Sequence, residues 1–160
     1  MTVTKQENRM KTVITPDYKG LVDIGWAYKL EGSLVVDGSL EINLGNKWLF
    51  VTEGIEAGRG IKAGSGIEAG WGIEAGWGIK AGSGIEAGWD IKAGSGIEAG
   101  LSVICKKVLS FKFNLFSGTA TWKKATDEES IIECLRLSGG GEVKHGTVRL
   151  LKKAQENPNG

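Results

Sequence analysis

Between residues 54 and 100 the chain repeats one hydrophobic pattern every six residues. Isoleucine returns at each sixth position from Ile55 to Ile97, alanine follows two residues later, and only Glu or Lys stands between them. Alternate residues of a strand point to the same side, so Ile and Ala share one face and the charge takes the other. In a helix, steps of six advance about 600° and would scatter the isoleucines. The pattern therefore predicts a series of three-residue strands.

Glycines separate these strands. A glycine follows each alanine, and after one variable residue a second glycine precedes the next isoleucine, except where Asp90 replaces it. Repeated Gly-x-Gly disfavours a helix and favours tight corners. Identical short strands joined by corners coil into a solenoid, with isoleucine and alanine inside. A flexible glycine linker has no reason to place isoleucine at eight consecutive sixth positions.

The number of repeats in one turn is less directly encoded. Three hexapeptides would make a triangular coil and two would make a flattened one. Stacking of Glu and Lys between coils does not distinguish them. The variable corner residue favours three sides, because that register places Ser65 beside Ser83 and Trp71 beside Trp89.

The pattern extends into both flanks. Short apolar runs broken by glycines fill 17–53 and predict further strands. After the repeat, the isoleucine positions continue as Val103, Leu109 and Leu115. Polar and apolar residues alternate along 108–115, which predicts one strand. Residues 119–122 are predicted to form another. The segments 131–137 and 142–151 flank a glycine run typical of a hairpin turn.

These observations predict an all-β fold: a β-solenoid, with three sides favoured, β-strand caps and a small C-terminal β domain. The expected parts are a flexible N-terminal segment at 1–16, N-terminal strands or a cap at 17–53, a hexapeptide-repeat solenoid at 54–104, a C-terminal β cap or domain at 105–155, and a tail at 156–160.

Composition narrows the function classes. With 20 Lys and Arg against 19 Asp and Glu in 160 residues, the whole chain is not an electrostatic binder of nucleic acid. Residues 101–160 carry ten basic and six acidic groups, which leaves a nucleic-acid partner open for this basic C-terminal part. There is no apolar run of about 20 residues and no apolar signal core, so we expect a cytoplasmic protein without a membrane partner.

Candidate catalytic chemistry is sparse. Two cysteines and one histidine cannot supply a four-ligand zinc cage, and we expect no metal, cofactor or catalytic residue. We expect a structural role for His145, the only histidine. Cys105 takes an alanine position and is expected to fill the core as a reduced thiol.

Tryptophan is the most suggestive feature. Trp71, Trp77 and Trp89 occupy the variable corner, where their bulk predicts outward side chains. They serve either as binding anchors, as exposed aromatics often do, or as packing for a flank or a ladder. The other expected binding residues are the neighbouring cations Arg59, Lys62, Lys80 and Lys92. The remaining tryptophans, Trp26, Trp48 and Trp122, are expected in the core.

The pattern Ile-Glu/Lys-Ala-Gly-x-Gly at 54–100 resembles the hexapeptide-repeat left-handed β-helix family. The stretch Leu34–Ile42 is similar to the repeats of bactofilin-type polymer-forming proteins. The GIEAG and GIKAG copies also resemble repeat proteins of phages and mobile elements, some with anti-defence roles such as anti-CRISPR.

We consider three functions, of which the resemblance supplies the host-defence target of the first and the whole of the third, while the exposed tryptophans and open strand edges supply the rest. The first is a non-enzymatic protein whose rigid surface engages and inhibits a macromolecular partner, such as a host defence effector. The second is a self-assembling structural solenoid, and hence a homo-oligomer. The third and weakest is a hexapeptide acyltransferase, in which a loop histidine would act as general base; here that would have to be His145.

Overall fold

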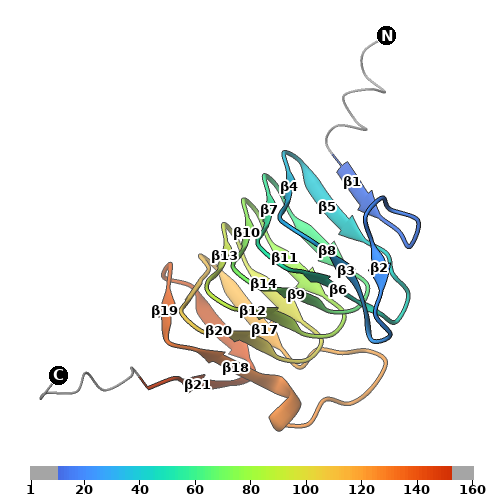
Figure 1. The fold of residues 1–160 in the computed structure, drawn as a ribbon. Helices are drawn as coiled ribbons and strands as arrows, with labels where there is room; N and C mark the ends of the chain where they lie inside the picture. The colour runs from blue at the N-terminus through green and yellow to red at the C-terminus, as the bar shows by residue number, and fades with distance from the viewer. Residues whose placement is uncertain (1–10, 153–160) are drawn as a thin grey trace, which may run out of the picture.

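The computed structural model describes residues 11–152, which wind into a β-solenoid of about seven turns (Figure 1). The chain runs from sheet to sheet around a common interior and returns to the first sheet one level further along. Each turn, called a coil here, thus adds one strand to each of three sheets.

The three sheets are named A, B and C. Sheet A contains, in spatial order, β1 (Lys11–Ile14), β5 (Ser39–Ile42), β8 (Ile61–Ala63), β11 (Ile79–Ala81), β14 (Ile97–Ala99), β17 (Asn114–Ser117) and β20 (Glu142–His145). Sheet B contains β2 (Val22–Asp23), β3 (Ala27–Leu30), β6 (Trp48–Val51), β9 (Ile67–Ala69), β12 (Ile85–Ala87), β15 (Val103–Cys105), β18 (Ile131–Cys134) and β21 (Thr147–Leu150). Sheet C contains β4 (Leu34–Val36), β7 (Ile55–Ala57), β10 (Ile73–Ala75), β13 (Ile91–Ala93), β16 (Val108–Ser110) and β19 (Arg136–Ser138).

Strand pairing confirms the three-sided coil. β10 pairs in parallel with β7 and β13, so Ile73 lies between Ile55 and Ile91 at a spacing of 18 residues. The outward row on the same strands is Glu56, Glu74 and then Lys92.

The interior is a continuous column of aliphatic side chains. All eight repeat isoleucines are at most 2% exposed, and the alanines beside them are buried as well. Burying a large aliphatic side chain contributes roughly 1.5–3 kcal/mol. This column therefore holds the coils together, and the charged residues remain outside, as the sequence predicts.

The two corner glycines differ in what they contact. A Cβ added at Gly58, the first glycine of its corner, would collide with the backbone carbonyl of Asp37 in the preceding coil. A Cβ at Gly60, the second glycine, would lie 3.5 Å from the carbonyl oxygen of Gly78, an ordinary contact. In this corner the first position thus demands glycine, whereas the second has room for a side chain, as the equivalent position before Ile91 has for Asp90.

At the N-terminal end the interior is covered, although β1, β2 and β4 each have a described strand neighbour on one side only. Residues 11–14, which the sequence assigns to a flexible segment, instead form β1 and pair with β5 because Ile14 completes the core and is fully buried. The rest of that expected segment, 1–10, lies outside the described residues. β2 pairs antiparallel with β3 at the edge of sheet B. As predicted, 17–53 supplies the first coils.

The C-terminal end differs from the sequence prediction in its pairing. β19 and β20 do not form a hairpin, because each pairs in parallel with the strand one coil earlier, β16 and β17. Residues 108–115 form parts of two strands rather than one, with a corner at buried Phe111 between them. Residues 119–122 form no strand. They belong to an inserted segment at 118–127, which precedes the short 3-10 helix η1 (Glu128–Ser130).

The segment predicted as a C-terminal β cap or domain thus supplies the last strands of the same three sheets up to Leu150. The expected tail at 156–160 lies outside the described residues. Within 11–152, no helix is long and apolar enough to cross a membrane.

Candidate binding surface

The three corner columns have different chemistry. The corner between sheets B and C carries Trp71 and Trp89, and the corner between C and A carries Arg59 and Trp77. The corner between A and B carries small residues, such as Ser65. A spacing of 18 residues keeps each type in its own column, so the repeat sequence determines which edges of the molecule are aromatic.

Trp71 and Trp89 form a stacked pair on the solvent side. Their ring centroids lie 5.4 Å apart with an interplanar angle of 6°, and the side chains are 44% and 50% exposed. The backbone N–H of Trp89 donates to the carbonyl of Trp71 at 3.1 Å, which sets the two residues in adjacent coils. The predicted ladder and the predicted exposure therefore coexist, and the pair remains available to a partner.

A shallow hollow of about 270 Å³ adjoins this pair on sheet C. Its walls include the two indoles, the carboxylates of Glu56 and Glu74, and Val35, an exposed apolar side chain. The hollow offers apolar contact beside negative charge, a combination that suits the aliphatic stem and charged head of a basic side chain.

Trp77 lies at the opposite edge of sheet C. The guanidinium of Arg59 sits 5.2 Å from the centre of its ring, a cation–π arrangement. Lys107 takes the same place over Trp89, at 5.4 Å. Sheet C is thus bordered on both sides by an indole with a cation over it.

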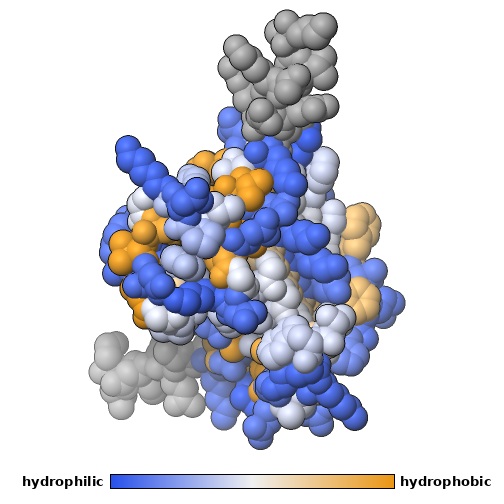
Figure 2. Space-filling view, turned by 90° about the vertical axis from the view of Figure 1, so that its right-hand side faces the viewer, coloured by the Kyte–Doolittle hydropathy of each residue, from blue (hydrophilic) through white to orange (hydrophobic). Residues whose placement is uncertain are grey.

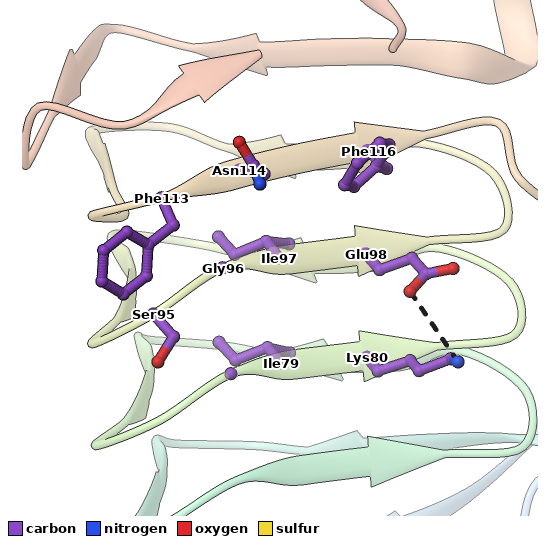
Figure 3. Close-up of a pocket in the computed structure, with 10 residues that line it drawn as sticks. Ile79, Lys80, Ser95, Gly96, Ile97, Glu98, Phe113, Asn114 and Phe116 are labelled. Carbon is purple, nitrogen blue, oxygen red and sulfur yellow. Dashed lines mark ion pairs between the residues drawn. The ribbon is translucent and has the colours of Figure 1, made fainter. Parts of the chain in front are cut away.

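The predicted lysines divide between two faces. Lys92 lies on sheet C, in register with Glu74. Lys62 and Lys80 are neighbours on sheet A, where the Nζ of Lys80 lies 3.7 Å from a carboxylate oxygen of Glu98 (Figure 3). The structure therefore brings Lys92 to the same sheet as the Trp71–Trp89 pair and places Lys62 and Lys80 on another sheet.

Sequence reasoning missed the aromatic residues of sheet A. Phe113, Asn114 and Phe116 border a hollow of about 360 Å³ together with Lys80 and Glu98 (Figure 3). The alternation at 108–115 suggested one strand, and this concealed the corner that turns Phe113 outward. The outward direction of Phe116 could have been predicted, because this residue follows the inward Leu115 and takes the position that Glu98 has one coil earlier.

Two tryptophans expected in the core are on the surface. Trp26 and Trp122 are 53% and 61% exposed, and only Trp48 is half-buried. The prediction was wrong because the interior row is already filled by side chains such as Leu49 and Ile67, which leaves no room for an indole.

The residues with catalytic potential are engaged or buried. The Nδ1–H of His145 donates to the carbonyl of Ser117 at 2.5 Å. Cys105 and Cys134 are free, buried thiols, and burial, reinforced by the nearby Cys134, raises the pKa of Cys105 to about 12. Within residues 11–152, no three His, Cys, Asp or Glu side chains cluster in a way that could hold a metal ion.

Sheet B carries a pair of stacked carboxylates. Glu68 and Glu86 are neighbours in register, bordered by Phe50 on one side and Ile104 on the other. Partial burial raises the pKa of both side chains, and the charge of Glu68 adds to the shift of Glu86. From Phe50 to Ile104, the outward row of sheet B is therefore two carboxylates between two apolar side chains, without a lysine.

The side of the molecule that lies on the right of Figure 1 is mostly hydrophilic, with hydrophobic residues in separate patches (Figure 2).

Comparison with protein-family models, curated proteins and solved structures finds no match to this chain.

Proposed function

We propose that this chain is a non-enzymatic binding protein that engages a protein partner through sheet C and its bordering tryptophans. The observation that carries the proposal is the stacked, exposed Trp71–Trp89 pair. Tryptophan is enriched among the residues that contribute most to protein–protein affinity. Here the rings are held by neighbouring coils, so little side-chain freedom would be lost on binding.

The surroundings of the pair favour a partner with a basic side chain. The adjoining hollow has Glu56 and Glu74 beside the apolar Val35. A lysine or arginine of the partner would place its stem against the apolar surface and its charge near the carboxylates. Lys92, further along the same row, would favour an acidic group one coil away and so define the binding register.

Inhibition of a bacterial defence protein is the most specific form of this proposal. It is supported by the resemblance of the GIEAG and GIKAG copies to repeat proteins of phages and mobile elements. A rigid solenoid that covers the working surface of a partner would act by steric obstruction, which requires no catalytic group.

Affinity capture from a bacterial lysate tests the proposal. The full chain and the triple variant Trp71→Ser, Trp77→Ser and Trp89→Ser serve as baits, with Trp122→Ser as a control that removes an exposed indole at the corner between sheets A and B. We expect mass spectrometry to find a protein retained by the native chain and the control but lost with the triple variant. Equal retention by all three baits would refute the anchor role of the tryptophans.

Self-assembly is a second candidate, favoured by the open C-terminal end. The inward residues Leu137 and Val148 of the last coil are 37% and 38% exposed, whereas Ile14 at the other end is fully buried. β19, β20 and β21 each have a described strand neighbour on one side only. Such edges can pair with another chain.

Light scattering after size exclusion separates the two functions. End-to-end assembly predicts a mass that rises with protein concentration and falls to that of one chain in Leu137→Lys. A monomer at every concentration would remove this second candidate and leave the binding proposal intact.

A further inference from the structure

The corner between sheets A and B carries a feature that the binding surface on sheet C does not use. In the middle coils this corner is a tight turn, but after β17 the chain inserts residues 118–127 before it enters η1 and sheet B. The inserted segment folds back along the corner towards earlier coils. It lies at the lower right of Figure 1, on the side that Figure 2 turns to the viewer.

Trp122 anchors the inserted segment. Its indole Nε1–H donates to the carbonyl of Gly82 at 3.0 Å, across 40 residues of sequence. The segment is braced internally by an ion pair of 2.6 Å between Lys123 and Glu129 and by a hydrogen bond from Ser130 Oγ to the carbonyl of Thr126. The ring is held by its edge and remains 61% exposed, with the Nζ of Lys123 5.9 Å from its centre on one face.

Trp48 supplies the second aromatic wall. It begins β6, and its ring lies against Gly66 so closely that a Cβ at Gly66 would collide with the indole. Trp26 packs against Trp48 at a centroid distance of 6.4 Å in an edge arrangement. Trp48 is therefore fixed from two sides, although it belongs to a coil far along the chain from Trp122.

The two indoles line one pocket of about 530 Å³. The rest of the lining includes Ser65, Ser83, Leu101 and Asn46, of which Ser83 is 8% exposed. The Oγ of Ser65 donates to the backbone carbonyl of Asn46 at 3.2 Å, which ties this corner to the turn before β6. The volume is within the range of small-molecule sites, about 300–1,000 Å³.

The pocket lining contains no charged residue. The nearest lysines in sequence each have a carboxylate partner: Lys47 pairs with Asp23 at 2.6 Å, and Lys123, whose Nζ lies 5.9 Å from the centre of the Trp122 ring, pairs with Glu129. A phosphate or carboxylate would thus meet no unpaired positive charge, which makes its burial costly. A purely apolar molecule would cover the serine hydroxyls and the amide without replacing their hydrogen bonds to water.

We propose that this pocket binds a neutral saccharide. The C–H face of a sugar ring would lie on an indole, and its hydroxyl groups would exchange hydrogen bonds with Ser65, Ser83 and Asn46. The pocket is large enough for one or two rings. The site lies at a different corner from Trp71 and Trp89, so this inference does not depend on the proposed protein partner.

Titration of the full chain with neutral disaccharides tests the inference. The probes are cellobiose, maltose, lactose and N,N′-diacetylchitobiose, followed by tryptophan fluorescence and calorimetry. We expect saturable binding of at least one of them, weakened at least tenfold by Trp122→Ala and several-fold by Ser65→Ala. Trp77→Ala, which removes an exposed indole from another corner, should bind as the native chain does.

Two further arms define the outcomes. Trp71→Ser with Trp89→Ser should retain saccharide binding, which separates this site from the proposed protein-binding surface. Adenosine, a neutral planar heterocycle, should bind at least tenfold more weakly than the best disaccharide. The inference is overturned if no disaccharide binds, if binding survives both Trp122→Ala and Ser65→Ala, or if adenosine binds more tightly.

Discussion

In the corner that contains Gly58 and Gly60, only the first glycine excludes a side chain. Gly58→Ala should destabilise the protein by about 2 kcal/mol or more, because the methyl group would force apart two stacked coils. Gly60→Ala, two residues away, should change the free energy of unfolding by less than about 1 kcal/mol. It can even stabilise the protein, because alanine reduces the conformational entropy of the unfolded chain. Urea unfolding of both variants measures the difference. Equal losses would contradict the contact described for Gly58.

The carboxylates of sheet B make stability depend on pH. Burial raises the pKa of Glu86 in the folded protein, with a further contribution from Glu68. The folded state therefore binds more protons than the unfolded state, and stability falls as the pH rises above the ordinary Glu pKa of 4.5. Glu86→Gln should remove this penalty and stabilise the protein at pH 7 by about 0.5 kcal/mol.

Thermal unfolding at several pH values checks this prediction. The native chain and Glu86→Gln should converge well below pH 4.5, where Glu86 is protonated in both folded and unfolded states. Glu74→Gln is the matched control. Glu74 lies between Glu56 and Lys92, so this substitution removes one unfavourable and one favourable charge contact and should change stability little. An advantage of Glu86→Gln that persists in acid would show that charge is not its cause.

At the scale of single elements, β1 is an integral strand of the solenoid. Ile14 is fully buried, whereas Val13 on the same strand points outward and is 42% exposed. Ile14→Ala should cost about 2–4 kcal/mol of stability and Val13→Ala less than about 1 kcal/mol. Chemical denaturation followed by circular dichroism compares the two. A small loss for Ile14→Ala would mean that β1 contributes little to the fold.

The repeat elements were predictable from sequence because each of their positions carries a separate constraint. Isoleucine requires the interior, glycine the corner, and Glu or Lys the solvent, so the strands at 55–99 follow directly. The spacing of Trp71 and Trp89 added the number of sides. The same reasoning found the exposed tryptophan pair, because a bulky residue at a corner has no interior space to occupy.

Elements outside the repeat were predicted less well because their sequence fits more than one structure. Glycines at 139–141 suit a hairpin and also suit a solenoid corner, and only pairing with the preceding coil decides between them. Trp122 had no local indication of exposure. Its position depends on a hydrogen bond to Gly82, a contact that no local pattern encodes.

For the whole molecule, the coil length of 18 residues determines which side chains share a corner. Duplicating residues 73–90 should add one coil and retain the order of all three corner columns. Duplicating only 73–78 should rotate everything after the insertion by one face, so that Trp48 and Trp122 no longer line the same pocket. Both variants should remain β-structured, because every inserted hexapeptide still buries Ile and Ala.

Near-ultraviolet circular dichroism distinguishes these two insertions. The 18-residue insertion should retain the tryptophan spectrum of stacked rings, and the six-residue insertion should lose it, because the residue in register with Trp71 is no longer Trp89. If the six-residue insertion kept the native spectrum, the corner columns would not be fixed by the coil length.

The contrast between the covered first coil and the open last coil bears on how the chain is made. Synthesis delivers the N-terminal end first, and each later coil needs only the coil before it as a template. Folding on the ribosome can therefore proceed in the order of translation, one level at a time, without waiting for distant segments. The strand edge exposed at any moment of synthesis is then the growing front of that process, on which the next strand pairs.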